Sequence, residues 1–416
     1  MFYEFKYILK NYINKLTSIL ALMLMGFIVF SPFGTILLMD KIGLPISIPE
    51  LLFLPFIYIF RKRYHFSPIG KIRALIYITI WVLLIFISFI ADNYSASLII
   101  SSSRTYLTLI IAFLFFSKKN DVSLDDVMYI SLGATLGWLY SSLYGINLYL
   151  NGDAETISRT GNMLSIPLLI SISIFRKHNK TFFFSIILCV LLSLTSGMRR
   201  QIVVFIASLV ISYGFLFIRR SKKYFSSILM LFFLTGIFVL FLPNIGEYFE
   251  SNVPQLYYRV FEKSSSIFPD GTINTQDNSR IENIVSTFDN ISEFILPRGF
   301  ISRRTEKDGT GGYIDFPLSE LFYMFGVFIS LALLLVLIYL TVKCYKNSLE
   351  NDSESQIFVI MSIILFMLLF LEGTFLSSSY TSPFTGYCLG HLKYNSRVTF
   401  TLGPQRKANQ IIEKTD

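Results

Sequence analysis

Apolar runs long enough to cross a lipid bilayer recur along almost the whole of this chain, and this repetition limits how it can fold. A helix needs about 20 apolar residues to cross a hydrocarbon core of roughly 30 Å, and in lipid each crossing must satisfy its own backbone hydrogen bonds. The predicted spans are 16–38, 42–60, 74–90, 98–116, 127–150, 163–175, 181–198, 201–218, 225–242, 317–342 and 357–376. With 53% hydrophobic and only 15% charged residues, a soluble domain of this size is excluded. We therefore predict an all-α polytopic integral membrane protein with about 11–12 transmembrane helices.

Clusters of Lys and Arg fall in alternate connections between these spans. They occur at 61–73, 118–119, 176–180, 219–223 and 343–346. The positive-inside rule places such connections in the cytoplasm, and the N-terminus, with Lys6 and Lys10, falls on the same side. No small-residue cleavage site follows the first span, so we expect it to be retained as a helix rather than removed as a signal peptide.

One long polar segment, 243–316, interrupts the apolar pattern and falls on the external side of the membrane. It separates the predicted helices of 1–242 from the C-terminal helices of 317–390, which a polar basic tail over 391–416 follows. An odd number of spans would leave this basic tail outside. We therefore expect a short additional crossing over 377–390 to return it to the cytoplasm.

Several kinds of chemistry are excluded by residue usage. The cysteines and histidines are scattered, and the 243–316 segment contains neither, so no disulfide framework or metal cluster is expected. There is no Walker-type loop and no Gly-rich dinucleotide fingerprint, so ATP-driven transport by this chain alone is not expected. The net charge of +9 comes largely from cations at helix ends, which does not favour a nucleic-acid partner.

Arginines on the external side run against the positive-inside rule, and each needs a reason. Arg199 and Arg200 lie in a tight Gly-containing turn, 195–200, between two spans whose other ends are cytoplasmic. Two guanidinium groups in one turn favour anion binding, because each matches phosphate oxygens through two parallel hydrogen bonds. Arg104 and Arg159 lie at the external ends of other spans. The alternative for these arginines is contact with lipid head groups or a role at a helix end.

The external segment contains a predicted amphipathic helix within 277–300. Apolar residues recur there at a spacing of three to four, which predicts a face that docks on the membrane domain or the bilayer interface. Arg280 lies in the first turn of this helix, the unfavourable end for a cation, and Arg298 lies in the Pro-Arg-Gly-Phe turn that ends it. We expect a ligand or an acidic partner for Arg280, with a solvated surface arginine as the alternative.

Two carboxylates mark the end of the external segment. Asp315 and Glu320 follow a glycine-rich approach, 309–312, and lie where the chain enters the next span. A carboxylate placed there can accept a proton from a substrate hydroxyl. The alternative is that both only complement the dipole at a helix N-terminus.

These features together resemble the Wzy-type O-antigen polymerase and O-antigen ligase superfamily. The resemblance covers the architecture of nearly the whole chain, with motif-level similarity confined to about 195–200 and 278–326. Met198 and Arg200 stand where the family often has a small residue. Asp315 stands where the ligase branch carries histidine, and this difference favours the polymerase branch.

The resemblance implies a GT-C-like enzyme at the periplasmic face of the bacterial inner membrane that needs no metal or other cofactor. It would join undecaprenyl-diphosphate-linked repeat units, and a flippase and a chain-length regulator would be possible partners beside the lipid bilayer. Asp315 would be the base, with Glu320 as the substitute. The diphosphate-binding set would be Arg199, Arg200, Arg280, Arg298, Arg104 and Arg159. An O-antigen ligase, a lipid-linked oligosaccharide flippase or other transporter, and an assembly partner in envelope biogenesis remain the alternatives.

The topology is directly testable with reporter fusions. Alkaline phosphatase folds to its active form only outside the cytoplasm, so a fusion near Asp270 should be active and a fusion near Lys223 inactive, because the cation clusters alternate consistently. Activity should be normalised to the amount of each fusion protein. Strong activity at Lys223 together with none at Asp270 would reverse the orientation.

Overall fold

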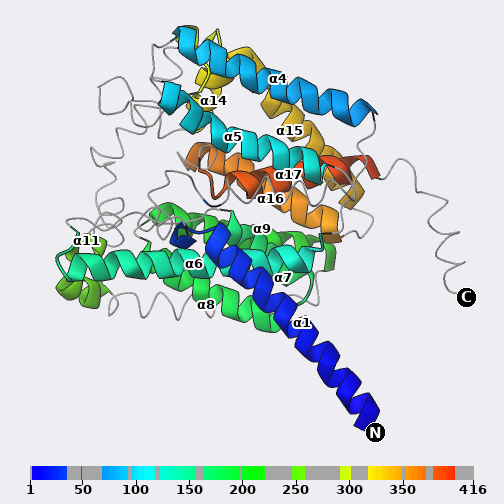
Figure 1. Ribbon diagram of the computed structural model, residues 1–416, viewed down its shortest axis with the longest axis vertical. Coiled ribbons are helices and arrows are strands. Elements are labelled where there is room, and N and C mark those ends of the chain that lie inside the picture. Colours follow the sequence, from blue (N-terminus) through cyan, green and yellow to red (C-terminus); the bar gives the residue numbers. More distant parts are fainter. Residues whose placement is uncertain are drawn as a thin grey trace, which may run out of the picture. The chain divides into compact units, whose positions relative to one another are not determined.

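Two compact units built only from helices make up the described part of the chain (Figure 1). The computed structural model describes residues 2–34, 48, 68–91, 96–117, 122–154, 164–196, 198–220, 246–257, 291–300, 317–348, 353–371 and 378–398. Unit 1 comprises Met1–Pro55 and Val122–Asn283, and unit 2 comprises Phe56–Asp121 and Ile284–Asp416. Each unit therefore combines an early stretch of the chain with a later one.

Unit 1 is organised around α6 and α7. Its helices are α1 (Phe2–Val29), α6 (Leu124–Leu150), α7 (Ser165–Phe175), α8 (Asn179–Thr195), α9 (Arg199–Arg220) and the short α11 (Pro254–Tyr257). The α6 helix packs against α1, α7 and α8, while α7 packs against α6, α8 and α9. Residues 165–173 of α7 are all buried. This helix consists of Ile, Leu, Ser, Pro and Phe, without a charged face, as expected for a helix surrounded by others.

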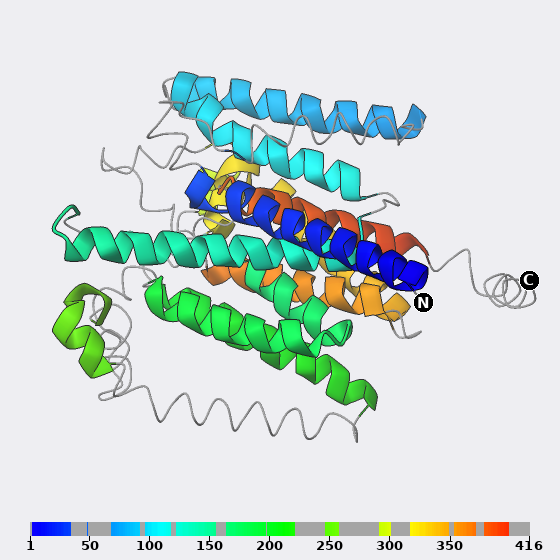
Figure 2. The same cartoon turned by 60° about the horizontal axis from the view of Figure 1, so that its bottom comes forward.

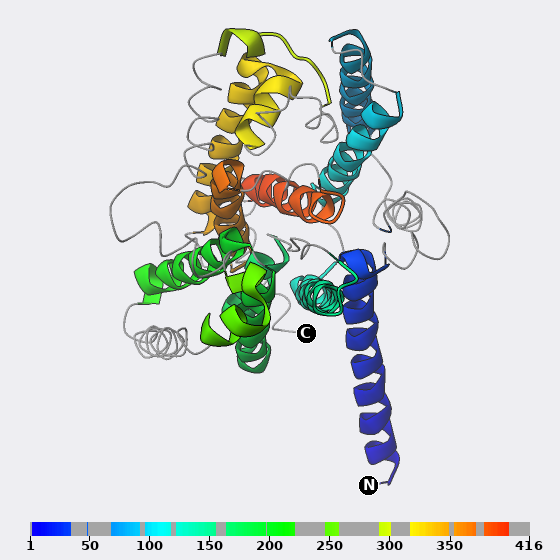
Figure 3. The same ribbon diagram turned by 90° about the vertical axis from the view of Figure 1, so that its left-hand side faces the viewer.

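Glycines on α6 determine how closely α1 approaches it. Gly133 and Gly137 lie one turn apart, and an added Cβ would collide with the backbone of Met23 at the first position and with Ser31 at the second. Figure 3 looks along α6 and shows the C-terminal part of α1 beside it. This is the small-xxx-small arrangement by which helices in lipid bring their backbones together.

Unit 2 has α17 at its centre. Its helices are α4 (Pro68–Ala91), α5 (Ala96–Phe116), the 3-10 turn η2 (Ile291–Phe294), α14 (Pro317–Phe325), α15 (Val327–Ser348), α16 (Ser353–Leu371) and α17 (Ser382–Val398). The α17 helix packs against α5, α15 and α16, and α4 lies along α5 (Figure 2). Gly386 and Gly390 give α17 a close approach to the backbone of α5, so both units use the same packing device.

Three described helical segments are long and apolar enough to cross a membrane: Ala74–Ala91, Arg200–Phe217 and Val327–Ser348. Shorter apolar helices cover Lys15–Val29, Ser102–Phe116, Ser165–Phe175, Asn179–Thr195 and Glu354–Phe370. On α4 and α15, large side chains such as Phe86, Ile90 and Phe328 are 61%, 82% and 71% exposed. An apolar face of this kind suits contact with lipid. The structure thus agrees with an all-α membrane protein.

Most of the predicted spans that fall on described residues coincide with helices. The spans 74–90, 98–116, 127–150, 163–175, 181–198, 201–218 and 357–376 correspond to α4, α5, α6, α7, α8, α9 and α16. The helix predicted over 16–38 begins earlier, at Phe2. The span 42–60, apart from Ile48, and the span 225–242 lie outside the described residues.

The predicted single span 317–342 is wrong in one respect, because two helices replace it. Gly326 separates α14 from α15 and has a φ of +77°, a left-handed conformation that glycine adopts without a steric penalty. The Ser330 hydroxyl donates to the Leu321 carbonyl at 2.7 Å across this break. The predicted crossing over 377–390 also differs, because α17 starts at Ser382 and continues to Val398.

The close packing of α1 on α6 can be tested with two identical substitutions. Gly133→Ala should lower the thermal unfolding temperature of the purified protein in detergent, because the new methyl group meets the Met23 backbone. Gly214→Ala in α9 is the matched control, since no atom of another described element lies within 4 Å of the added Cβ. Alanine favours a helix by about 1 kcal/mol over glycine, so the control should be unchanged or more stable. Equal stability of the two variants would contradict this packing.

Candidate functional site

Glu320 is a buried carboxylate in the first turn of α14. Pro317 begins the helix, a position where its missing N–H is not needed, and an acidic residue in the first turn complements the helix dipole. Only 6% of Glu320 is exposed. The Tyr106 hydroxyl of α5 donates a hydrogen bond of 2.5 Å to Glu320 Oε1. A buried carboxylate needs such a donor, because leaving water without one is costly.

The Pro-Arg-Gly-Phe segment, called here the 297–300 turn, docks on three helices of unit 2. The Arg298 N–H donates to the Tyr323 carbonyl at 2.9 Å, and the buried Phe300 N–H donates to Ser88 Oγ of α4 at 2.6 Å. The Phe300 ring lies 5.2 Å from the Tyr106 ring on α5. Gly299 has a φ of +87°, and an added Cβ would collide with Ser88. Both the turn and its close approach to α4 therefore require glycine.

Arg298 and Glu320 are linked through the tyrosines that contact them, Tyr323 and Tyr106. The Arg298 guanidinium carbon lies 5.6 Å from the centre of the Tyr323 ring, within the range of a cation–π interaction, and Tyr323 follows Glu320 by less than one helical turn. Arg104 is half-buried on α5, two residues before Tyr106. We call the group of Tyr106, Arg298, Phe300, Glu320 and Tyr323 the Glu320 junction.

The other candidate residues lie elsewhere. Arg199 and Arg200 begin α9 in unit 1, where the Met198 N–H donates to Ser196 Oγ at 3.3 Å. Gln201 beside them is fully buried, and its amide makes no hydrogen bond within the part of the chain that the structure describes. Buried amides usually have partners. Asp315, Arg280 and Arg159 lie outside the described residues, as does most of the helix predicted within 277–300; its last part, 291–294, is a 3-10 turn.

Sequence reasoning missed three residues of this region: Tyr106, Tyr323 and Ser88. A signal for Tyr106 is present, because residues 101–106 form a polar stretch inside an apolar span. Polar residues in such a position mark functional or packing sites. Tyr323 and Ser88 have no comparable local signal. The Tyr323 carbonyl accepts a backbone N–H from the 297–300 turn and its ring faces the Arg298 guanidinium, while the Ser88 hydroxyl accepts a second backbone N–H from the turn.

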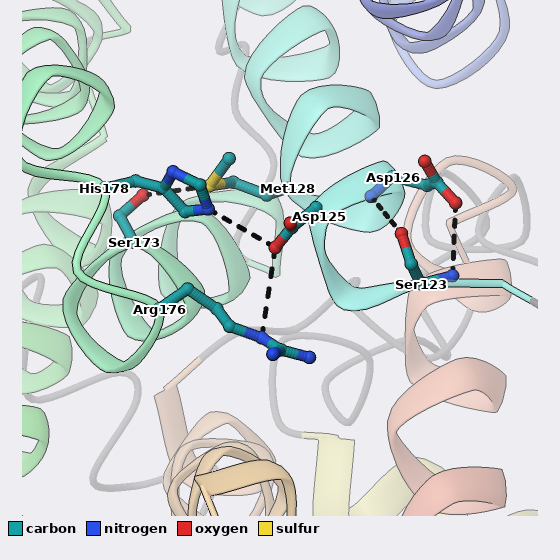
Figure 4. Close-up of polar contacts among 7 residues, drawn as sticks. All are labelled: Ser123, Asp125, Asp126, Met128, Ser173, Arg176 and His178. Carbon is teal, nitrogen blue, oxygen red and sulfur yellow. Dashed lines mark hydrogen bonds and ion pairs between the residues drawn. The ribbon is translucent and has the colours of Figure 1, made fainter. Parts of the chain in front are cut away.

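A second polar cluster joins the start of α6 to the α7–α8 turn in unit 1 (Figure 4). Asp125 Oδ1 lies 3.4 Å from His178 Nε2 and 3.9 Å from Arg176 Nε. Ser123 and Asp126 form a capping box at the same helix start. The side chains of Asp125, Arg176 and His178 are 34–46% exposed, and exposed ion pairs contribute at most about 1 kcal/mol. This cluster therefore adds little to stability, and it connects the α7–α8 turn to the start of α6.

Within the described ranges, no three His, Cys, Asp or Glu side chains lie together in a way that could hold a metal ion. His391 instead stacks on Phe358, with ring centres 4.6 Å apart, and its Nδ1 lies 3.4 Å from Glu354 Oε1. This histidine joins α17 to α16.

Comparison of the chain with family models, with curated protein sequences and with solved structures finds no match. The resemblance to the O-antigen polymerase and ligase superfamily, drawn from residues 195–200 and 278–326, therefore stays a prediction. The Glu320 junction holds two of the candidate residues, Arg298 and Glu320.

Docking of the 297–300 turn predicts a measurable change in hydrogen exchange. Ser88→Ala removes the acceptor of the buried Phe300 N–H, and an unsatisfied buried donor costs about 1–3 kcal/mol. Amide exchange in a peptide spanning the turn should then accelerate by about 10- to 100-fold. Ser117→Ala is the control, because among the described residues that hydroxyl bonds only the Leu114 carbonyl at the end of α5. Unchanged exchange in Ser88→Ala would mean that the turn does not depend on this contact.

Proposed function

We propose that this protein is a glycosyltransferase that polymerises undecaprenyl-diphosphate-linked oligosaccharide repeat units into O-antigen or another surface polysaccharide. The observation that carries the proposal is the Glu320 junction. The buried Glu320 carboxylate accepts a hydrogen bond there, and Tyr323, which follows it closely in the chain, faces Arg298. A base for the attacking hydroxyl and a cation for the leaving diphosphate are the two groups that such a transfer needs.

The carboxylate and the guanidinium groups have separate roles in the proposed transfer. A hydroxyl of the acceptor repeat unit attacks the anomeric carbon of the donor chain, and the bond from that carbon to the diphosphate oxygen breaks. The hydroxyl proton passes to a carboxylate, and the electron pair leaves with undecaprenyl diphosphate. Fixed guanidinium groups stabilise the negative charge that develops on the diphosphate, and we assign this role to Arg199, Arg280 and Arg298, with Arg200, Arg104 and Arg159 as further members.

Two carboxylates are candidates for the base. Asp315 is favoured by the sequence pattern, and Glu320 by its burial and its hydrogen bond with Tyr106. A positioned base accelerates such a transfer by about 10²–10⁴-fold. The buried Gln201 amide beside Arg199 and Arg200 offers a donor group, Nε2, and an acceptor, Oε1, which suits a sugar hydroxyl or a phosphate oxygen.

The proposal includes a location. The protein would cross the bacterial inner membrane about 11–12 times, with a cytoplasmic N-terminus and the 243–316 segment in the periplasm, where lipid-linked repeat units arrive after a flippase has turned them outward. The alternating cation clusters support this orientation. A chain-length regulator is the expected protein partner.

One structural observation favours a second candidate, a carrier of lipid-linked oligosaccharides. The helix break at Gly326 separates α14 from α15, and secondary transporters often form their substrate sites at interrupted helices. A buried carboxylate can also carry a proton across a membrane. Against a carrier stand the external segment of about 74 residues and the lack of a detectable sequence repeat.

Deletion of the gene separates the candidates by the product that remains. Loss of a polymerase should remove the long-chain ladder of surface polysaccharide and leave a single repeat unit on the surface, visible on a gel. Loss of a ligase should leave long chains on the lipid carrier, whereas loss of a flippase should trap single repeat units inside. Either of the last two patterns would contradict a polymerase.

Variants expressed in the deletion strain extend this test to the site. Arg298→Lys should restore the ladder almost as poorly as Arg298→Ala, because lysine keeps the charge but loses the planar fork. Asp315→Asn and Glu320→Gln together should abolish extension, since neither amide accepts the proton. Glu250→Gln is the matched control, an exposed carboxylate in the same external segment, and should give a normal ladder at equal protein level.

A further inference from the structure

Tyr106 contacts both Glu320 and the 297–300 turn within the Glu320 junction. Its hydroxyl donates to Glu320 Oε1 at 2.5 Å, and its ring packs on Phe300 with the two ring centres 5.2 Å apart and the planes tilted by 39°. Only 7% of Tyr106 is exposed. The first contact reaches the carboxylate, and the second reaches the turn that carries Arg298.

These two contacts restrict the geometry of the site in different ways. The hydrogen bond fixes one oxygen of the Glu320 carboxylate and so limits rotation of the carboxyl plane, since a charge-assisted bond is short and directional. The ring contact supports the 297–300 turn from α5, whereas Ser88 contacts the same turn from α4. A tyrosine with a buried ring and a bonded hydroxyl performs both tasks at once.

We propose that Tyr106 is a positioning residue for glycosyl transfer. Its hydroxyl holds the Glu320 carboxylate, and its ring holds the 297–300 turn that carries Arg298. This inference rests on the proposed function and adds that Glu320, rather than Asp315, receives the proton. The acceptor oxygen bonds the anomeric carbon, its proton moves to Glu320, and the diphosphate leaves with the electron pair. Tyr106 keeps its own proton throughout.

Positioning of this kind has a large kinetic effect. A displacement of about 1 Å caused by a change away from the reacting atoms can reduce the rate about 100-fold. Residues that fix a catalytic group are needed for the same reason, because a side chain held loosely spends little time in the productive geometry. Tyr106 does not have to touch the substrate to have this effect.

The test uses the purified full-length protein in liposomes with an undecaprenyl-diphosphate-linked repeat unit as substrate. Tyr106→Phe keeps the ring contact and loses the hydroxyl, so kcat for chain extension should fall about 10- to 100-fold while KM stays within about twofold. Tyr77→Phe is the matched control, because Tyr77 packs edge-on against Phe113 in the same unit, and its kinetics should not change. A wild-type kcat in Tyr106→Phe would overturn the inference.

A double variant shows whether the hydroxyl acts through the carboxylate. If it does, Tyr106→Phe combined with Glu320→Gln should be no slower than Glu320→Gln alone, because the hydroxyl then has no carboxylate left to orient. If the double variant is instead slower than Glu320→Gln by the same factor that Tyr106→Phe shows alone, the inference is contradicted. If Tyr106→Phe lowers the folded yield, Phe300→Leu tests the second contact instead: kcat should fall several-fold, because Arg298 stabilises charge that develops only as the diphosphate leaves, and an unchanged kcat would overturn this part.

Failure of the inference and failure of the proposed function give different results. If the wild-type protein lengthens no chains in this assay, the proposed function is wrong. If the wild-type protein lengthens chains and both Tyr106→Phe and Phe300→Leu do so equally well, the function stands and only the positioning role is wrong.

Discussion

A carboxylate buried among apolar helices requires a hydrogen-bond donor, and the arrangement of unit 2 depends on how Glu320 obtains one. The donor is Tyr106, which lies 214 residues earlier in the chain. This contact joins α14 to α5, and the Tyr106 ring also supports the 297–300 turn. The short α14 can take this position because the chain breaks at Gly326 before α15 begins. A hydrogen bond of this kind adds about 1.5–3 kcal/mol of net stability, and losing the donor costs more.

The second constraint is close helix packing without a strong hydrophobic driving force. Between helices in lipid, apolar surface alone gives little attraction, so small residues that admit close backbone contact determine which helices pair. Gly133 and Gly137 bring α6 to α1, and Gly386 and Gly390 bring α17 to α5. The α5 helix, which carries Tyr106, is thus fixed by α17 on one side. It is tied to α4 by the hydrogen bond from Trp81 Nε1 to the Ser103 carbonyl at 2.9 Å.

Hydropathy predicted most of the described helices, because an apolar run of this length has few alternatives in lipid. It missed the break at Gly326, since averaging over a span hides a single glycine. It underestimated the extent of α17, whose Ser, Thr and Tyr residues lower its hydropathy although its residues 382–390 are mostly buried. Glu320 and Arg298 were predictable from local patterns. The polar stretch 101–106 was a signal for Tyr106, but its pairing with Glu320 was not predictable, because a contact between distant helices leaves no trace in the spacing of neighbouring residues.

The central claim is that this chain joins lipid-linked repeat units and releases undecaprenyl diphosphate as each linkage forms. The most direct measurement is the stoichiometry of that release by the purified protein in liposomes supplied with a lipid-linked repeat unit, with product length determined by mass spectrometry. The account predicts one undecaprenyl diphosphate released for every repeat unit added. Movement of repeat units across the bilayer, with neither lengthening nor release, would contradict it and identify a carrier.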